Sequence, residues 1–149
     1  MFRFLEHDSE IGVEACNDSI TGMLVDSSKA LFSIMTDISK VDIVSSFNVS
    51  VESYSVEELV VSLLNELIFL MNVNFHFFSK FEYTLYDREV YGVKKFFLEG
   101  KVFGEPISED KHTLHVEVKA VTFSGLKFFV RENDNSSKKE YCIIFVVDI

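Results

Sequence analysis

Three groups with hard oxygen donors stand at the ends of two expected strands. Glu10 begins an early strand, and Asp148 ends the last strand beside the α-carboxylate of Ile149. If these strands are neighbours, the three groups converge, and such donors suit Ca²⁺ or Mg²⁺ better than a soft metal. The same residues also fit two solvated strand-end acids next to a frayed terminus, because chain ends are commonly disordered. The pattern leaves both interpretations open.

A second candidate is Lys119, a charge in the middle of a strand expected at 115–122. The lysine alternates in register with Glu117 and Val121. That alternation is also typical of a solvent-facing lysine on an amphipathic strand. Its position therefore permits a functional role without requiring one.

Catalytic motifs are otherwise missing from the sequence. It contains no GxSxG, no glycine-rich phosphate loop, and no CxxC or HExxH spacing. An isolated histidine is more often a surface or core-edge residue than a ligand. Signals for an enzyme are therefore weak. The four histidines are His7, His76, His112 and His115.

The stretch 55–71, SVEELVVSLLNELIFLM, predicts the central helix. Ser55 can accept a backbone N–H at the helix start, with Glu58 three residues on as in a capping box. A narrow polar stripe that includes Asn65 faces a broad apolar surface, so most of the helix should be covered. The helix is too short and too polar on this stripe to span a bilayer, and it should therefore lie across a sheet.

The remaining pattern supplies a second helix and several strands. Ser19 should cap the helix that follows it. A turn is expected near 87–89, and the almost wholly apolar run 141–147 predicts a central strand covered on both faces. We therefore predict an α+β fold, with two helices packed in two layers on a mostly antiparallel, partly mixed β-sheet.

Composition limits the classes of function. With 149 residues, 48% of them hydrophobic, the chain suffices for one domain spanning 1–149. Its formal net charge is −10, and Lys and Arg form no block, so we expect no direct binding to nucleic acid. Two cysteines, Cys16 and Cys142, are too few for a disulfide framework, and the start reaches charged residues too early for a signal peptide. We expect a cytoplasmic protein that does not associate with membranes.

Five motifs in one order resemble those of the archease family, and the resemblance covers essentially the whole chain. It implies a protein cofactor, not an enzyme, whose partner is the RtcB-type tRNA-splicing RNA ligase. Such a cofactor accelerates formation of the ligase–guanylate intermediate and allows repeated turnover in tRNA splicing and RNA repair. The motifs are HDSEIG at 7–12, SVEELVVSLLNELIFL at 55–70, GEP at 104–106 with His112, VKAVTF at 118–123, and VDI at 147–149.

The resemblance also implies roles for particular residues. A divalent cation, Ca²⁺ or Mg²⁺, would be held by Glu10, Asp148 and the terminal carboxylate of Ile149. Lys119 would be the lysine that matters for ligase activation. Glu10 stands where the family usually has aspartate, so its carboxylate lies one methylene further from the backbone.

Three further residues of the shared motifs are candidates for partner activation. They are His7, Asp8 and His112, and Asp8 could also supply an additional oxygen to the cation. Two other functions remain as alternatives: a metal-dependent hydrolase of a small substrate, and a metal-free scaffold or chaperone module. A hydrolase would turn over substrate without any ligase, whereas a metal-free scaffold would gain no stability from divalent cations.

Overall fold

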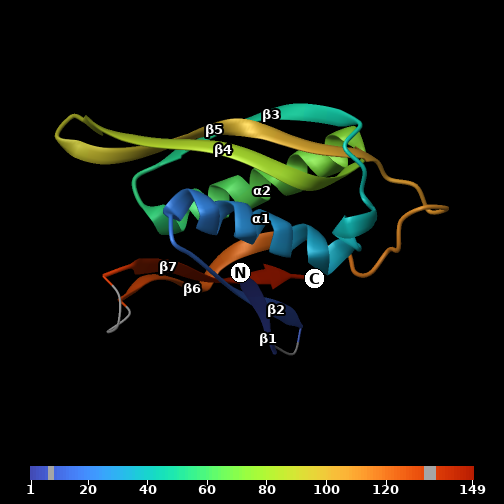
Figure 1. Ribbon diagram of the computed structural model, residues 1–149, viewed down its shortest axis with the longest axis horizontal. Coiled ribbons are helices and arrows are strands. Elements are labelled where there is room, and N and C mark those ends of the chain that lie inside the picture. Colours follow the sequence, from blue (N-terminus) through green and yellow to red (C-terminus); the bar gives the residue numbers. More distant parts are fainter. Residues whose placement is uncertain (7–8, 133–136) are drawn as a thin grey trace.

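Two antiparallel sheets enclose a layer of two helices (Figure 1). The structure is a computed structural model that describes residues 1–6, 9–132 and 137–149. One sheet has the strand order β1-β2-β7-β6, and the other has the order β3-β5-β4. The elements, in chain order, are β1 (Phe2–Glu6), β2 (Glu10–Asn17), α1 (Ile20–Met35), η1 (Ile38–Lys40), β3 (Ser45–Ser53), α2 (Val56–Asn74), β4 (His76–Val90), β5 (Val93–Pro106), β6 (Ala120–Glu132) and β7 (Lys139–Asp148).

Helix α2 begins as its sequence predicts. The Ser55 side chain accepts a hydrogen bond from the Glu58 N–H at 3.1 Å, which satisfies one of the free amides of the first turn. The helix then contacts β3 of one sheet and β6 of the other, so its apolar surface is covered on two sides. Its buried residues are Val56, Leu59, Val60, Val61, Leu63, Leu64, Leu67, Ile68 and Met71.

Helix α1 lies beside α2 and also contacts both sheets, through β2 and β4. Ser19 caps it, accepting the Gly22 N–H at 2.9 Å, as the sequence predicts. Two of its three serines are fully buried. Ser27 and Ser28 donate to the carbonyls four residues earlier, at 2.8 and 2.9 Å, so their hydroxyls enter the core with partners.

The predicted α+β class with two helices on antiparallel sheets is confirmed, but the sheet arrangement differs. We predicted one partly mixed sheet in two layers, whereas every strand pairing described is antiparallel and the helices lie between two sheets. A helix that is apolar around most of its circumference is best covered by two sheets. The terminal strand β7 is central in its sheet, between β2 and β6, as its apolar run predicts.

Two local expectations were wrong. The turn expected at 87–89 lies instead at Tyr91 and Gly92, both with positive φ, because β4 and β5 continue further as a long hairpin. Residues 113–119 belong to no strand, and β6 begins only at Ala120.

No helix in the described ranges is both long enough and apolar enough to cross a membrane.

Candidate functional site

The ends of β2 and β7 bring two of the predicted carboxylates together. Glu10 and Asp148 are direct partners in the antiparallel register of these strands. Directly opposite residues of an antiparallel pair point to the same face, with Cβ atoms about 4.5–5.5 Å apart. Both residues are partly exposed, and Ile149 follows at once with its carboxylate. This end of the sheet, defined by Glu10, Asp148, Ile149 and Lys119, is called the carboxylate edge below.

Lys119 joins the carboxylate edge through its backbone. Its N–H donates to the Asp148 carbonyl at 2.8 Å, and its side chain is exposed. The next residue, Ala120, is the register partner of Asp148 in the β6–β7 pair. The structure therefore brings the two acids together from opposite ends of the chain and places the backbone of Lys119 next to them, with Ala120 and not Lys119 in register with Asp148.

The donors at the carboxylate edge fit a hard divalent cation. Like charges directly opposite on neighbouring strands destabilise a sheet unless something neutralises them. In the portion of the chain that the structure describes, neither Glu10 nor Asp148 forms a salt bridge with a lysine, arginine or histidine. Carboxylate oxygens without basic partners are the kind of ligand that Ca²⁺ prefers in proteins.

Asn65 of α2 holds the first residues of β6 in place. Its side-chain amide donates to the Val121 carbonyl at 3.0 Å and accepts the Val121 N–H at 2.9 Å. One side chain thus satisfies both backbone groups of a residue two positions beyond Lys119. This pair of bonds ties the carboxylate edge to the central helix.

A buried carboxylate anchors the segment that leads to Lys119. Glu105, at the end of β5, accepts the Asp42 N–H at 2.6 Å and the Lys111 ammonium at 2.7 Å. It also lies 3.2 Å from His112 Nε2. His112 Nδ1 accepts the Ser108 N–H at 3.0 Å, so its proton lies on Nε2 and that atom donates to Glu105.

The environment of Glu105 favours its charged form. Burial by itself raises the pKa of the carboxyl, but the hydrogen bonds from Lys111, the Asp42 amide and His112 outweigh it. The net effect lowers the pKa of Glu105 to about 2. The hydrogen bond to Asp42, followed by that to Glu105, raises the pKa of Lys111. Both groups therefore stay charged across the physiological pH range. Their ion pair anchors the segment that leads to Lys119.

The structure separates His112 from the predicted partner surface. Its ring is only 4% exposed and packs edge-on against Phe77, with centroids 5.5 Å apart. A buried, hydrogen-bonded histidine supports the loop that carries Lys119 and offers no exposed surface for a partner. The other two candidates, His7 and Asp8, lie outside the described residues.

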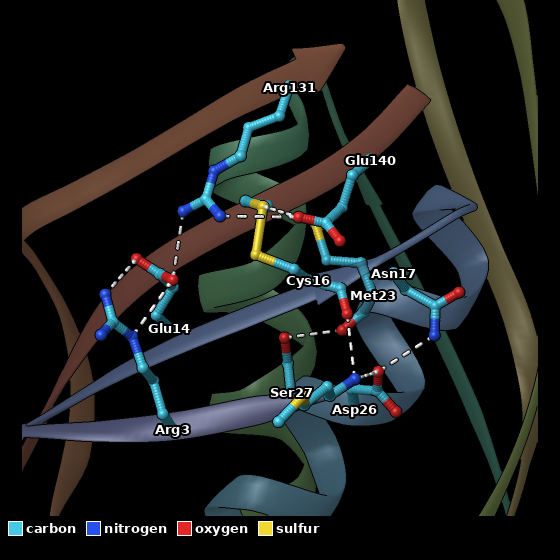
Figure 2. The surroundings of a disulfide bond; sticks show 11 residues. Arg3, Glu14, Cys16, Asn17, Met23, Asp26, Ser27, Arg131 and Glu140 are labelled. Carbon is cyan, nitrogen blue, oxygen red and sulfur yellow. Dashed lines mark hydrogen bonds and ion pairs between the residues drawn. A yellow bond between two sulfur atoms is a disulfide. The ribbon is translucent and has the colours of Figure 1, made fainter. Parts of the chain in front are cut away.

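The opposite end of β2 and β7 carries a disulfide, which the sequence analysis did not anticipate (Figure 2). Cys16 and Cys142 are register partners across the two strands, with Cα atoms 4.2 Å apart. The two residues are 126 positions apart in the chain, so only the strand pairing shows that they meet. Glu140 lies close to the two sulfur atoms, but sulfurs joined in a disulfide are not thiolates and do not make a metal site.

Charged side chains surround this disulfide on the outer face of the sheet (Figure 2). The Glu14 carboxylate pairs with Arg3 at 3.2 Å and with Arg131 at 3.3 Å. Hydrogen bonding from Arg3 is the main reason that the pKa of Glu14 is lowered. Arg131 also reaches Glu140 at 3.6 Å. These ion pairs join β1, β2, β6 and β7. They do not involve any residue of the carboxylate edge, which lies at the other ends of the strands.

Sequence reasoning missed two supporting groups. Asn65 was recognised only as part of the polar stripe of its helix, although a half-buried amide usually has a hydrogen-bond partner. Glu105 was noted only in the GEP motif. Its partner Asp42 is far away in the chain, and no local pattern reveals such a contact.

The fold and the site together define a small α+β protein that presents paired carboxylates and a lysine at one end of a sheet. Residues 2–149 match the model of the Archease protein family. The chain belongs to the archease family.

Relatives and a solved structure agree with this assignment. The chain is 32% identical to protein archease of Sulfurisphaera tokodaii, over 99% of this chain and 98% of the relative. It is 31% identical to protein archease of Methanopyrus kandleri, over 93% and 95% of the two chains. The solution structure of Methanobacterium thermoautotrophicum protein 1598 has the same fold, with a TM-score of 0.76 at 24% identity and coverage of 99% and 98%.

Proposed function

We propose that this protein is a non-enzymatic cofactor that activates an RtcB-type RNA ligase, promoting its guanylylation and repeated turnover. Membership of the archease family supports the general role. The observation that carries the proposal is that the Lys119 backbone is bonded to Asp148, the register partner of Glu10, at the carboxylate edge. A surface lysine beside an acidic cluster suits contact with a nucleotide or metal site of a partner better than turnover of a substrate by this chain.

The activating residue in this proposal is Lys119. Its exposed ammonium can approach phosphate oxygens of a guanylate or of the ligase-bound nucleotide, where a point charge stabilises developing negative charge. The backbone bonds of Lys119 to Asp148 and of Val121 to Asn65 fix the direction from which the lysine leaves the sheet. A positioned charge is worth more to a partner than a mobile one, because less ordering is required on binding.

A divalent cation would be held by Glu10, Asp148 and the carboxylate of Ile149. When bound, it would neutralise these acids and fix the ends of β2 and β7 against β6. The protein can shift the ligase toward its guanylylation-competent state only by binding that state better than the others. The acidic surface favours a basic partner and makes the encounter sensitive to salt.

The test is joining of a broken tRNA by limiting cognate ligase, with GTP and a divalent cation, in the presence and absence of this protein. We expect many turnovers only when the protein is added. Lys119→Ala should remove most of the stimulation while leaving the fold intact, and Lys101→Ala, an exposed lysine in β5, is the matched control. An active ligase that gains nothing from the unaltered protein would refute the proposal. Substrate turnover without ligase would favour the hydrolase alternative.

A further inference from the structure

A groove of about 690 Å³ opens beside Lys119, at the end of the molecule where both helices finish. Its floor is apolar and buried, with Met35 from α1, Met71 from α2 and Phe77 from β4. Its rim is apolar but exposed: Phe75 and Leu114 have 63% and 52% of their surfaces free. A concave site with a mostly apolar lining and a few polar groups is the usual form of a binding site.

One wall of the groove is a segment that lacks strand partners. Residues 114–119 line it without belonging to a strand, and residues 113–117 are exposed. Two bonds fasten the segment to the body: His115 N–H to the Met35 carbonyl at 2.9 Å and Lys119 N–H to the Asp148 carbonyl at 2.8 Å.

The remaining backbone of this segment is free to pair. Leu114 and Val116, on either side of His115, make no backbone–backbone hydrogen bond within the portion of the chain that is described, and both residues are exposed. Exposed N–H and C=O groups without partners can pair with an extended chain from another protein.

The rim also has a strained aromatic. Phe75 ends α2 in the left-handed region, at φ 55°, and its side chain lies on the rim. A bulky residue rarely adopts this conformation, and strain of this kind gathers at binding and active sites. Glycine would end the helix without strain, but it would remove the exposed ring from the groove.

Charge indicates the chemistry of the occupant. Two exposed acids, Glu109 and Glu117, border the groove, and the chain as a whole carries −10. The only lysine among the lining residues is Lys119, at the end next to the carboxylate edge. An anionic nucleic acid is repelled here, whereas a segment with apolar side chains and flanking Lys or Arg is matched.

We propose that this groove receives an extended apolar segment of the partner ligase, flanked by basic residues, which adds as a strand to the backbone of residues 114–118. This inference rests on the proposed function and divides it between two surfaces. The groove supplies affinity by main-chain pairing and apolar contact, as in other strand-addition complexes. Lys119 and the carboxylate edge, adjacent to the groove, then act on the bound ligase.

The experiment separates affinity from activation. Ligase stimulation is measured as a function of protein concentration for the unaltered protein, for the double variant Leu114→Asp with Val116→Asp, and for Lys119→Ala. We expect the double variant to raise the half-saturating concentration about tenfold or more, with the plateau unchanged. Lys119→Ala should lower the plateau and leave the half-saturating concentration unchanged.

Two further variants test the chemistry of the occupant. Val116→Pro removes an N–H that has no backbone partner among the described residues, so it should weaken binding if a strand is added. Glu109→Lys with Glu117→Lys should raise the half-saturating concentration and reduce its dependence on salt. The matched control for the aspartate variants is Val93→Asp. Val93 is 52% exposed, as is Leu114, and it lies on the β4–β5 hairpin at the far end of the molecule (Figure 1). Circular dichroism confirms that each variant is folded.

The outcomes are distinct. If the unaltered protein stimulates the ligase and the double variant does so at the same concentrations, the groove proposal is wrong and the proposed function stands. If the unaltered protein never stimulates an active ligase, both proposals are wrong. A dimer in size-exclusion chromatography that the double variant dissociates would assign the groove to a second copy of this chain and overturn the inference.

Discussion

The side chain of Asn65 in the central helix bonds both backbone groups of Val121, at 3.0 and 2.9 Å. In effect the amide replaces a neighbouring strand for one residue of β6. The bonds lie two residues from Lys119, where the unpaired segment 113–119 enters the sheet. The helix therefore fixes the backbone close to Lys119, the proposed activating residue.

Replacing Asn65 with alanine should weaken both stability and activation. The substitution leaves two partly buried backbone groups without a partner, at a cost of about 2 kcal/mol. For a chain of this size that lowers the melting temperature by about 4 to 8 °C. Ligase stimulation should fall further than the loss of folded protein explains, because Lys119 loses its fixed position. Ser62→Ala, at an exposed position on the same helix, is the control, and equal effects of the two variants would contradict this role.

Glu105 should make stability depend on acid pH. Its folded-state pKa of about 2 lies below the usual 4.5, so its stabilising contribution is complete above pH 4.5 and is lost as the pH falls toward 2. Glu105→Gln should therefore be clearly less stable than the parent near pH 7, and the difference should shrink between about pH 5 and pH 3. Urea unfolding at several pH values measures this. The control is Glu109→Gln, an exposed acid in the same loop. A constant difference between parent and Glu105→Gln would be the contrary result.

Local features of the fold could be predicted from the sequence. The caps at Ser19 and Ser55 depend on residues within one turn, and the central place of β7 depends on its apolar run. The acids at 10 and 148 could be proposed as neighbours, because each stands at a strand end. The strand register shows that the two acids are direct partners, whereas binding of a cation to them remains a prediction.

Features that depend on distant contacts could not be predicted. The same alternating strand pattern fits either one partly mixed sheet or two antiparallel sheets. Only the packing of strands on both sides of the helices distinguishes the two arrangements. The Cys16–Cys142 pairing requires the β2–β7 register, across 126 positions of sequence. Residues 113–119 have a strand pattern but lack a strand partner, because strand formation depends on a neighbour as well as on the residues themselves.

The disulfide should stabilise the protein where it forms. Closing a loop of this length restricts the unfolded chain and is worth about 5 kcal/mol in the chain-entropy description. Reduction should lower the melting temperature of the parent, whereas Cys16→Ser should melt at one temperature with or without reductant. Mass spectrometry under non-reducing conditions reports whether the pair is oxidised. A parent that is oxidised yet unaffected by reduction would contradict the expectation.

Asp148→Asn should change the stability of the protein in opposite directions with and without calcium, and a calcium titration measures this. Without it, Glu10 and Asp148 repel each other across β2 and β7, so Asp148→Asn should be at least as stable as the parent in a chelator. With calcium at about 100 times its dissociation constant, the parent should gain about 2.7 kcal/mol, and the variant should gain much less.

The order of stabilities should therefore reverse between the two conditions, which a general loss of structure could not produce. Glu140→Gln, an exposed acid near the other end of β7, is the matched control and should keep the calcium response. Adding one glycine after Ile149 moves the terminal carboxylate and should reduce the response if that group is a ligand. A parent melting temperature that is indifferent to calcium and magnesium would favour activation through Lys119 alone.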